Sequence, residues 1–199
     1  MVIMNHSDEQ TLINKCKQGD EAAFQELVER YQVLVYNLVC RLTGEAAVAQ
    51  DILQETLTTA YKKIPRFKPG NFRAWLLRIA VNGSKDYLRS AAHRRQVSLE
   101  YLVDGVNHQL QDTGESPEEY SLRQEMSRVI QKALLQLPEE QRSALVLVDM
   151  QGLDYQEAAN VLKVPAGTLK SRLSRARAAM RQNLAPHMEL FPQQFRLKL

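Results

Sequence analysis

Residues 167–182, GTLKSRLSRARAAMRQ, carry five Lys or Arg side chains and no carboxylate. On a helix that turns about 100° per residue, the apolar positions form one narrow stripe that predicts burial. The stripe consists of Leu169, Leu173, Ala176, Met180 and Leu184. The outermost line holds Ser171, Ser174 and Ala178, with the cations along its two flanks. Short side chains that face base edges, flanked by cations that reach phosphates, suit the major groove of duplex DNA.

A solvated helix face is the alternative interpretation of this charge run. Such a face normally mixes signs, because Glu and Lys one turn apart stabilise each other. Between residues 158 and 188 there are six Lys or Arg and no Asp or Glu. The missing carboxylates favour contact with nucleic acid.

A second cationic stripe lies on a helix expected over residues 72–92. It repeats at spacings of three and four and consists of Trp75, Arg78, Asn82, Lys85 and Arg89. Unpaired bases stack on aromatic rings while cations follow the phosphates, and an amide can bond a base edge. The stripe therefore suits a single strand or an opened duplex. The alternative is that Trp75 is buried at a helix seam beside Phe67, Phe72 and Tyr61.

Carboxylates gather on the outer side of a helix expected over residues 45–63. This face contains Asp51, Gln54, Glu55 and Thr58. Paired carboxylates occur in metal nucleases, but no His or further acidic motif stands at helical spacing to complete a metal site. We therefore expect a docking face for a basic protein partner, with a plain solvated face as the alternative.

The motifs for other chemistries are absent from the sequence. Cys16 and Cys40 have neither metal-type spacing nor a His partner, which predicts reduced, packed thiols and no bound metal. No Walker or GxGxxG pattern occurs, so we expect neither a cofactor nor an enzyme. The sequence also lacks a long apolar run and the start of a signal peptide, which predicts a cytoplasmic protein without membrane insertion.

Charge is segregated along the 199 residues, whose net charge is only +3. Residues 1–64 have a net charge of −3, residues 65–95 of +7, residues 96–157 of −8 and residues 158–199 of +7. Two basic blocks separated by acidic ones predict two surfaces for polyanions, each on its own domain.

Apolar residues recur at three and four almost throughout, which predicts an all-α protein of two small helical domains. The first domain spans 1–95, with an opening helix capped by Ser7 and further helices over 21–42, 45–63 and 72–92. Residues 96–117 contain four carboxylates and no cation, which indicates an extended acidic linker. Ser116 and Glu119 then form a capping box before helices over 118–136, 139–150, 154–163 and 166–184. The last two have helix-turn-helix spacing, and residues 186–199 form an unassigned tail.

Several stretches occur together, in this order, in one family. They are GDEAAFQELVERYQ, DILQETLTTAYKKIPRF, FRAWLLRIAVNGSKDYLR and LPEEQRSALVLVDMQGLDYQEAANVLKVPAGTLKSRLSRARAAM. With them the sequence resembles an extracytoplasmic-function (ECF) sigma factor of bacterial RNA polymerase. The resemblance covers about residues 8–185. It implies that domain 1–95 is sigma region 2, that domain 118–185 is region 4, and that the chain directs promoter recognition, melting and initiation.

The resemblance also implies roles for individual residues. Asp51, Gln54 and Glu55 match positions that dock on the clamp helices of the largest polymerase subunit, and the flap region is a further contact. The positions matching the part that melts the −10 element and captures a flipped base are Phe67 and Asn71 in the loop, with Trp75 and Asn82. The last two belong to the stripe that also holds Arg78, Lys85 and Arg89. Those matching −35 recognition are Thr168, Lys170, Ser171, Arg172, Ser174 and Arg175. An anti-sigma protein is a further candidate partner, and the linker matches the segment threaded through the polymerase channel.

Two other classes of protein remain as alternatives. A homodimeric helix-turn-helix regulator would act on duplex DNA without polymerase, which would leave the face at Asp51 and the stripe at Trp75 unexplained. A nucleic-acid-processing enzyme would cleave labelled DNA with Mg²⁺. Ser174 is smaller than the residue that some members of the family place there, so the upstream preference cannot be carried over from any one relative.

Overall fold

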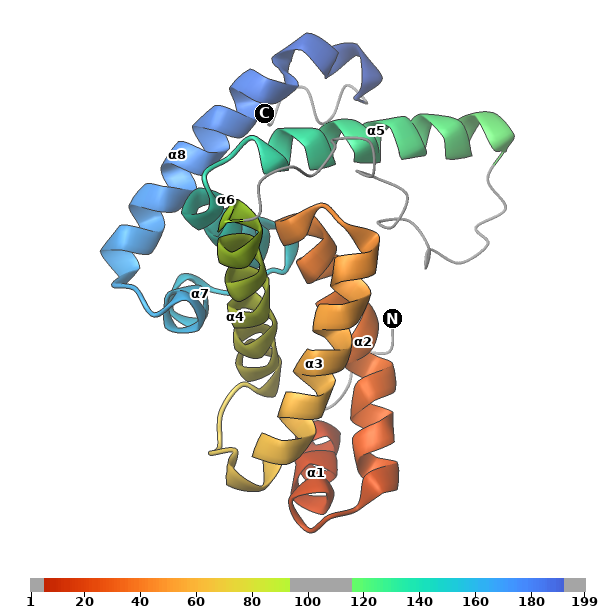
Figure 1. Cartoon of the computed structure of the whole chain (residues 1–199), viewed down its shortest axis with the longest axis vertical. Coiled ribbons are helices and arrows are strands. Elements are labelled where there is room, and N and C mark those ends of the chain that lie inside the picture. The colour runs from red at the N-terminus through yellow and green to blue at the C-terminus, as the bar shows by residue number, and fades with distance from the viewer. Residues whose placement is uncertain (1–5, 94–115, 192–199) are drawn as a thin grey trace.

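The computed structural model describes residues 6–93 and 116–191, and all regular structure in these two ranges is helical (Figure 1). The first range contains α1 (His6–Lys17), α2 (Glu21–Thr43), α3 (Ala46–Lys63), the short helix η1 (Ile64–Arg66) and α4 (Phe72–His93). The second contains α5 (Pro117–Leu135), α6 (Glu139–Leu145), α7 (Tyr155–Leu162), α8 (Ala166–Leu184) and η4 (Ala185–Leu190). A π-helical turn, Val146–Met150, continues α6. The all-α prediction is confirmed, whereas linker residues 96–115 lie outside the described ranges.

Local capping residues mark several helix starts. The Asp20 side chain accepts a hydrogen bond from the backbone N–H of Ala23 at the start of α2. Ser116 with Glu119, and Asp154 with Glu157, form complete capping boxes at α5 and α7. The expected cap at Ser7 is wrong, because α1 begins at His6 and so includes Ser7.

The N-terminal module, α1 to α4, packs its helices around an apolar core. α2 contacts α1, α3 and α4, and α3 lies along α4. A Cβ atom added to Gly83 would meet Cγ2 of Ile52 at 3.2 Å, so glycine permits the close approach of α3 and α4. The core between these helices includes Leu27, Leu38, Phe72 and Leu77.

The C-terminal module, α5 to η4, is built around the apolar stripe of α8. Leu169, Leu173, Ala176, Met180 and Leu184 are all buried, as the sequence predicts. α8 packs on α5, α6 and α7. Ala158 and Ala159 are buried at 0% and 1% exposure, and their small size lets α7 sit close to its neighbours in the helix-turn-helix.

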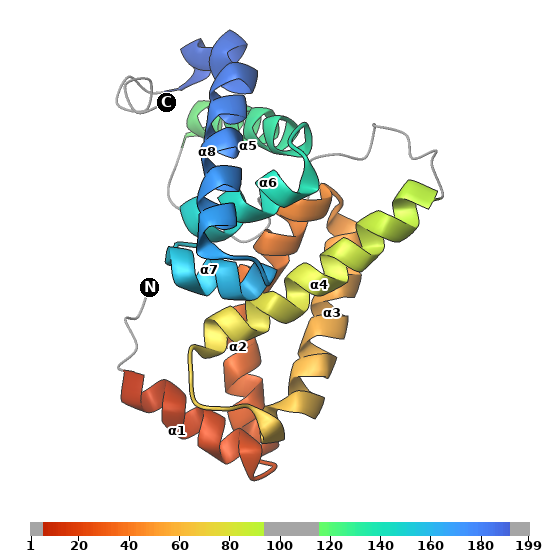
Figure 2. The same cartoon turned by 90° about the vertical axis from the view of Figure 1, so that its left-hand side faces the viewer.

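The two modules pack directly against each other. α7 lies against the first half of α4, and α5 contacts α2 (Figure 2). Gln131 of α5 is 1% exposed, and its amide donates to the backbone oxygen of Cys40 in α2 at 3.0 Å. Apolar residues of both modules belong to one continuous core. The sequence analysis did not predict this contact between the domains. Among the described helices none is both long and apolar enough to cross a bilayer.

Candidate nucleic-acid interface

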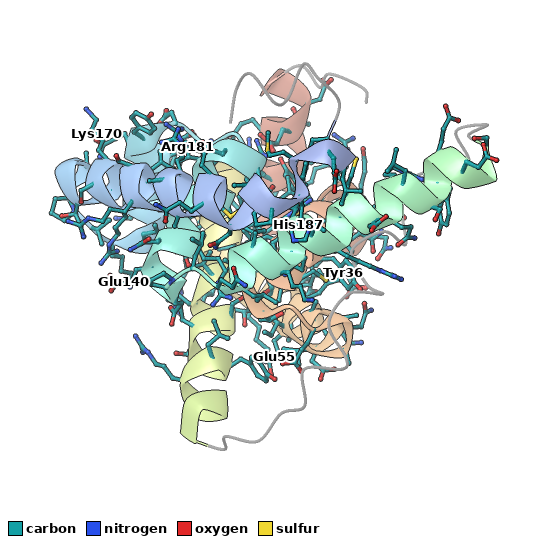
Figure 3. The ribbon with its side chains drawn as sticks, turned by 90° about the horizontal axis from the view of Figure 1, so that it is seen from above. Tyr36, Glu55, Glu140, Lys170, Arg181 and His187 are labelled. Atoms are coloured by element: carbon teal, nitrogen blue, oxygen red, sulfur yellow. The ribbon has the colours of Figure 1, made fainter. Side chains whose placement is uncertain are left out.

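The outer face of α8 has the small, polar outline expected from the sequence. Ser171, Ser174 and Ala178 are all exposed. The Ser171 hydroxyl donates to the backbone oxygen of Thr168 at 2.9 Å, so its oxygen still has acceptor capacity for a ligand. Lys170, Arg175 and Arg181 are exposed beside this line, and Lys170 points away from the body at one end of α8 (Figure 3).

The sequence predicts open cations along both flanks of this helix. In the structure, two of these cations are paired with carboxylates. Arg172 forms an ion pair with Glu140 of α6 at 2.7 Å, and its side chain is 19% exposed. Arg177 donates from Nε and Nη2 to the two carboxylate oxygens of Asp149 at 2.9 and 2.6 Å. This fork raises the pKa of Arg177 above its usual value. Glu140 of α6 and Asp149 of the π-helical turn thus neutralise part of the positive charge of α8, which has no carboxylate of its own.

Tyr155 is a candidate contact that the sequence analysis missed. Its ring is 40% exposed at the start of α7, and the ammonium of Lys170 lies 5.9 Å from the ring centroid. Tyr155 lies on α7 and Lys170 on α8, which are the two helices of the helix-turn-helix. Together they extend the polar face from α8 onto α7. The signal for Tyr155 in the sequence is its place directly after the capping residue Asp154.

An aromatic cluster surrounds Trp75 at the start of α4. The Trp75 ring lies 5.1 Å from the Phe67 ring and 5.4 Å from the Phe72 ring, measured between centroids. Phe67 is only 8% exposed, whereas Trp75 is half-buried. Tyr61, which the alternative interpretation placed beside Trp75, packs edge-on against Phe24 at 5.0 Å. Phe67 is buried and packs against the Trp75 ring, whereas part of the Trp75 surface stays accessible to a ligand.

Asn71 and Arg73 join this region to the C-terminal module. The Asn71 side chain accepts from the backbone N–H of Ala74 at 2.9 Å, which caps α4, and donates to Glu157 of α7. The Arg73 guanidinium donates to the backbone oxygen of Gln151. The start of the predicted −10 site is therefore engaged by the other module in this arrangement.

The rest of the stripe on α4 is more open. Asn82 and Arg89 are exposed, and Arg78 and Lys85 are half-buried. Arg89 approaches Asp86 only at 3.9 Å, with both side chains at least 75% exposed, so this pair constrains it little. These residues lie on one helix at the predicted spacing, and their contact with DNA stays a prediction.

The carboxylate face of α3 is exposed as expected. Asp51, Gln54 and Glu55, together with Thr58 and Thr59, line a shallow hollow on the surface. No cluster of His, Cys, Asp and Glu suited to a metal occurs in the described ranges. Glu55 and Lys170 lie well apart, on separate parts of the molecule (Figure 3). A partner on α3 and DNA on α8 could therefore be held at the same time.

Family models for sigma-70 region 2 and sigma-70 region 4 match residues 27–94 and 127–180. The RNA polymerase sigma-H factor of Pseudomonas aeruginosa is 35% identical over 189 residues, which cover 92% of this chain and 97% of the relative. The ECF RNA polymerase sigma-E factor of Haemophilus influenzae is 34% identical over 186 residues, covering 90% and 97%. The chain belongs to the ECF sigma factors. A helix-turn-helix regulator independent of polymerase is not favoured by these relatives.

Two solved structures share the fold of this sigma factor. CnrH, in complex with the cytosolic domain of CnrY, superposes with a TM-score of 0.66 at 23% identity, over 89% of this chain and 97% of CnrH. The sigma factor RpoE of Bartonella quintana, in complex with the anti-sigma factor NepR, gives 0.64 at 26% identity, over 81% and 96%. The arrangement of helices in this sigma factor is thus that of two known structures.

Proposed function

We propose that three surfaces divide the work of this sigma factor at a promoter. The face at Asp51, Gln54 and Glu55 docks on core RNA polymerase, the stripe on α4 holds the opened −10 element, and the outer face of α8 reads the −35 element. The observation that carries the proposal is that each surface has exposed polar residues on a different helix, within the two matched regions of the family. Residues 1–95 and 118–185 would then be the two functional domains, joined by the linker 96–117.

Strand opening in this scheme requires binding energy only, without an enzymatic step. A surface that binds unpaired bases better than paired ones shifts the equilibrium toward the open duplex. Trp75 offers a partly exposed ring supported by Phe67 and Phe72, on which a base can stack. Asn82, Lys85 and Arg89 continue along the same helix and can hold the strand.

Recognition of the −35 element would use the short side chains of α8 together with selected cations. Ser171 and Ser174 leave room for a base edge. Arg175, which follows Ser174 on α8, is exposed beside them. Arginine can bond guanine through two parallel hydrogen bonds. Arg172 is oriented by Glu140, and we propose that it contacts the phosphate backbone beside the base that Arg175 reads.

An anti-sigma protein is a further proposed partner. RpoE is solved in complex with the anti-sigma factor NepR, and this sigma factor has the same fold. We propose that a protein of this kind controls access to core polymerase. Copurification of the tagged sigma factor from its host, followed by identification of a protein that blocks initiation in vitro, would test it.

The central experiment is in vitro transcription with purified core polymerase on a promoter library. The Asp51→Ala, Glu55→Ala double variant should weaken association with core and reduce initiation, because the docking face loses both carboxylates. Asp8→Ala with Glu29→Ala removes the same charge from exposed positions of α1 and α2 and serves as the control. Equal copurification of both variants with core would contradict the docking face. No defined start site on any template would contradict the assignment as a whole.

A further inference from the structure

The ends of three elements meet at the tip of the N-terminal module. The C-terminal end of α1 lies against η1, and α3 runs directly into η1 (Figures 1 and 2). This tip gathers six cations from two separate segments of the chain: Lys15, Lys17, Lys62, Lys63, Arg66 and Lys68. Four of them belong to residues 1–64, a stretch of net negative charge, so the sequence does not reveal the basic surface.

The basic tip is open and short of counter-charge. Five of its cations are exposed and Lys17 is half-buried. None of the six forms an ion pair within the described ranges. Two carboxylates lie near these cations: Asp20 caps α2, and Glu21 accepts a hydrogen bond from Tyr61 at 3.4 Å, so the six cations still outnumber them. Like charges held together on a surface favour a polyanionic ligand.

Stabilisation of helix dipoles does not account for the whole cluster. Cations in the last turn of a helix interact favourably with its C-terminal end. This explains Lys15 and Lys17 in α1 and Lys62 and Lys63 in α3. Arg66 lies in the last turn of η1, a helix of only 3 residues with a correspondingly small dipole, and Lys68 lies in the loop after it, where no helix end accounts for it.

The basic tip is continuous with the aromatic cluster of the −10 site. The Lys17 ammonium lies 5.6 Å from the centroid of the Phe67 ring, and Phe67 packs on Trp75. Beside the cations, the Tyr61 ring is 44% exposed. Cations interleaved with an exposed aromatic ring are the usual composition of a surface for single-stranded nucleic acid.

We infer that the basic tip binds the phosphate backbone of single-stranded DNA that continues from the −10 site, with Tyr61 as a platform for one base. The inference rests on the proposed function of α4. It adds a surface that comes partly from outside the matched family regions, because Lys15 and Lys17 precede residue 27. Binding here is to phosphate charge and is independent of base sequence.

The test uses the full chain without polymerase and a fluorescein-labelled oligothymidylate of about 12 nucleotides, a length within the range covered by small single-strand sites. Fluorescence anisotropy is measured between about 0.05 and 0.3 M salt, where electrostatic binding changes steeply. The Lys15→Gln, Lys62→Gln, Lys63→Gln variant should bind more weakly. Its slope of log affinity against log salt should fall by about 2, since each lost contact with a single strand removes about 0.7. An unchanged slope overturns the inference.

A charge-matched control is Arg128→Gln, Lys132→Gln, Lys163→Gln, three exposed cations of the C-terminal module. Binding close to that of the unchanged protein supports the inference, whereas a loss equal to that of the tip variant shows that only net charge matters and overturns it. Circular dichroism establishes that each variant is folded.

Two further arms identify the ligand. Tyr61→Ala should weaken binding to oligothymidylate and Tyr61→Phe should not, because stacking requires only the ring. If the tip variant loses as much affinity for a blunt duplex of the same length, the assignment to a single strand is wrong. Initiation with core polymerase is measured separately: its failure in the unchanged protein contradicts the proposed function, whereas failure of the oligonucleotide arms contradicts this inference alone.

Discussion

Individual cations of α8 differ in their freedom to reach DNA. Arg177 is held by the two oxygens of Asp149 and Arg172 by Glu140, whereas Arg175 is exposed and Lys170 lies over Tyr155. A bidentate arginine–carboxylate pair fixes the plane of the guanidinium. The paired arginines therefore shape the surface of the helix, and Arg175 has the greater freedom to reach a base edge.

Replacing Arg175 by alanine tests this difference. We expect promoter binding by the holoenzyme to weaken by about 1–3 kcal/mol if Arg175 makes two hydrogen bonds to one base. The measurement is the dissociation constant on the selected promoter and on variants of each −35 base pair. Arg181→Ala, farther along α8, is the control. A loss of equal size on every sequence would show a phosphate contact instead.

Buried acid groups give a second prediction at this scale. Burial raises the pKa of the Cys16 and Cys40 thiols, and burial together with a hydrogen bond to Cys40 raises the pKa of Tyr36 to about 12. The unfolded chain therefore releases these protons at lower pH than the folded one does. Their contribution to stability is present at neutral pH and is lost as the pH rises through the folded-state values.

We expect the free energy of unfolding, measured in urea, to fall as the pH rises above about 8.5, where unfolded cysteine ionises. The decline should continue toward pH 12, because unfolded tyrosine ionises before Tyr36 does. Tyr36→Phe should flatten the upper part of this curve. A free energy of unfolding that is constant or rises over this range would contradict the burial of these groups.

At the scale of the element, Asn71 shows how one side chain can serve both a helix and a ligand. Its carbonyl oxygen caps α4, and its amide bonds Glu157 of α7. Residues at helix N-caps are limited to a few short polar types, which also suit contact with a base. If a mutation of Asn71 reduces DNA melting, this effect must therefore be distinguished from a loss of helix stability.

Asn71→Ala and Asn71→Ser make that separation. Alanine removes the cap and should lower the free energy of unfolding by about 1 kcal/mol, whereas serine retains it. Both variants lack the amide, so both should open the promoter less well if Asn71 holds a base. Urea denaturation gives the stability, and permanganate reactivity of thymines gives the extent of opening. Normal opening by the serine variant would exclude a role for the amide.

For the whole molecule, the packing of the two modules is the main structural feature. Gln131 is buried between them, and its amide donates to the backbone oxygens of Cys40 and Arg41 at 3.0 and 3.4 Å. A buried carbonyl that loses its donor carries a desolvation cost. This contact joins α5 to α2, whereas the Asn71–Glu157 bond joins the start of α4 to α7, so the interface is held through two different pairs of helices.

Gln131→Ala should loosen this packing. We expect a loss of about 1–3 kcal/mol in stability, the cost of leaving buried polar groups unsatisfied. Small-angle scattering should show a larger radius of gyration, and amide exchange at the end of α2 should become faster. Gln136→Ala, an exposed glutamine at the end of the same helix, is the control. An unchanged radius and exchange rate would contradict a role for Gln131 in holding the modules together.

The helices themselves follow from the sequence alone. The stripe from Leu169 to Leu184 and the capping pairs Ser116–Glu119 and Asp154–Glu157 are correct in the structure. Each of these signals lies within a few residues along the chain, where periodicity and capping act. The motifs that identify the family are likewise local stretches. Ser7 is the exception, because a capping motif there competes with a helix that begins at His6.

Only the tertiary structure decided which charges are free and which surfaces are joined. Arg177 and Asp149 are 28 residues apart, Asn71 and Glu157 are 86 apart, and Gln131 and Cys40 are 91 apart. The basic tip likewise combines the end of α1 with the end of α3 and η1. Such pairings depend on how helices cross, which a local period does not specify because it states only which face of a helix is buried, and not against which partner.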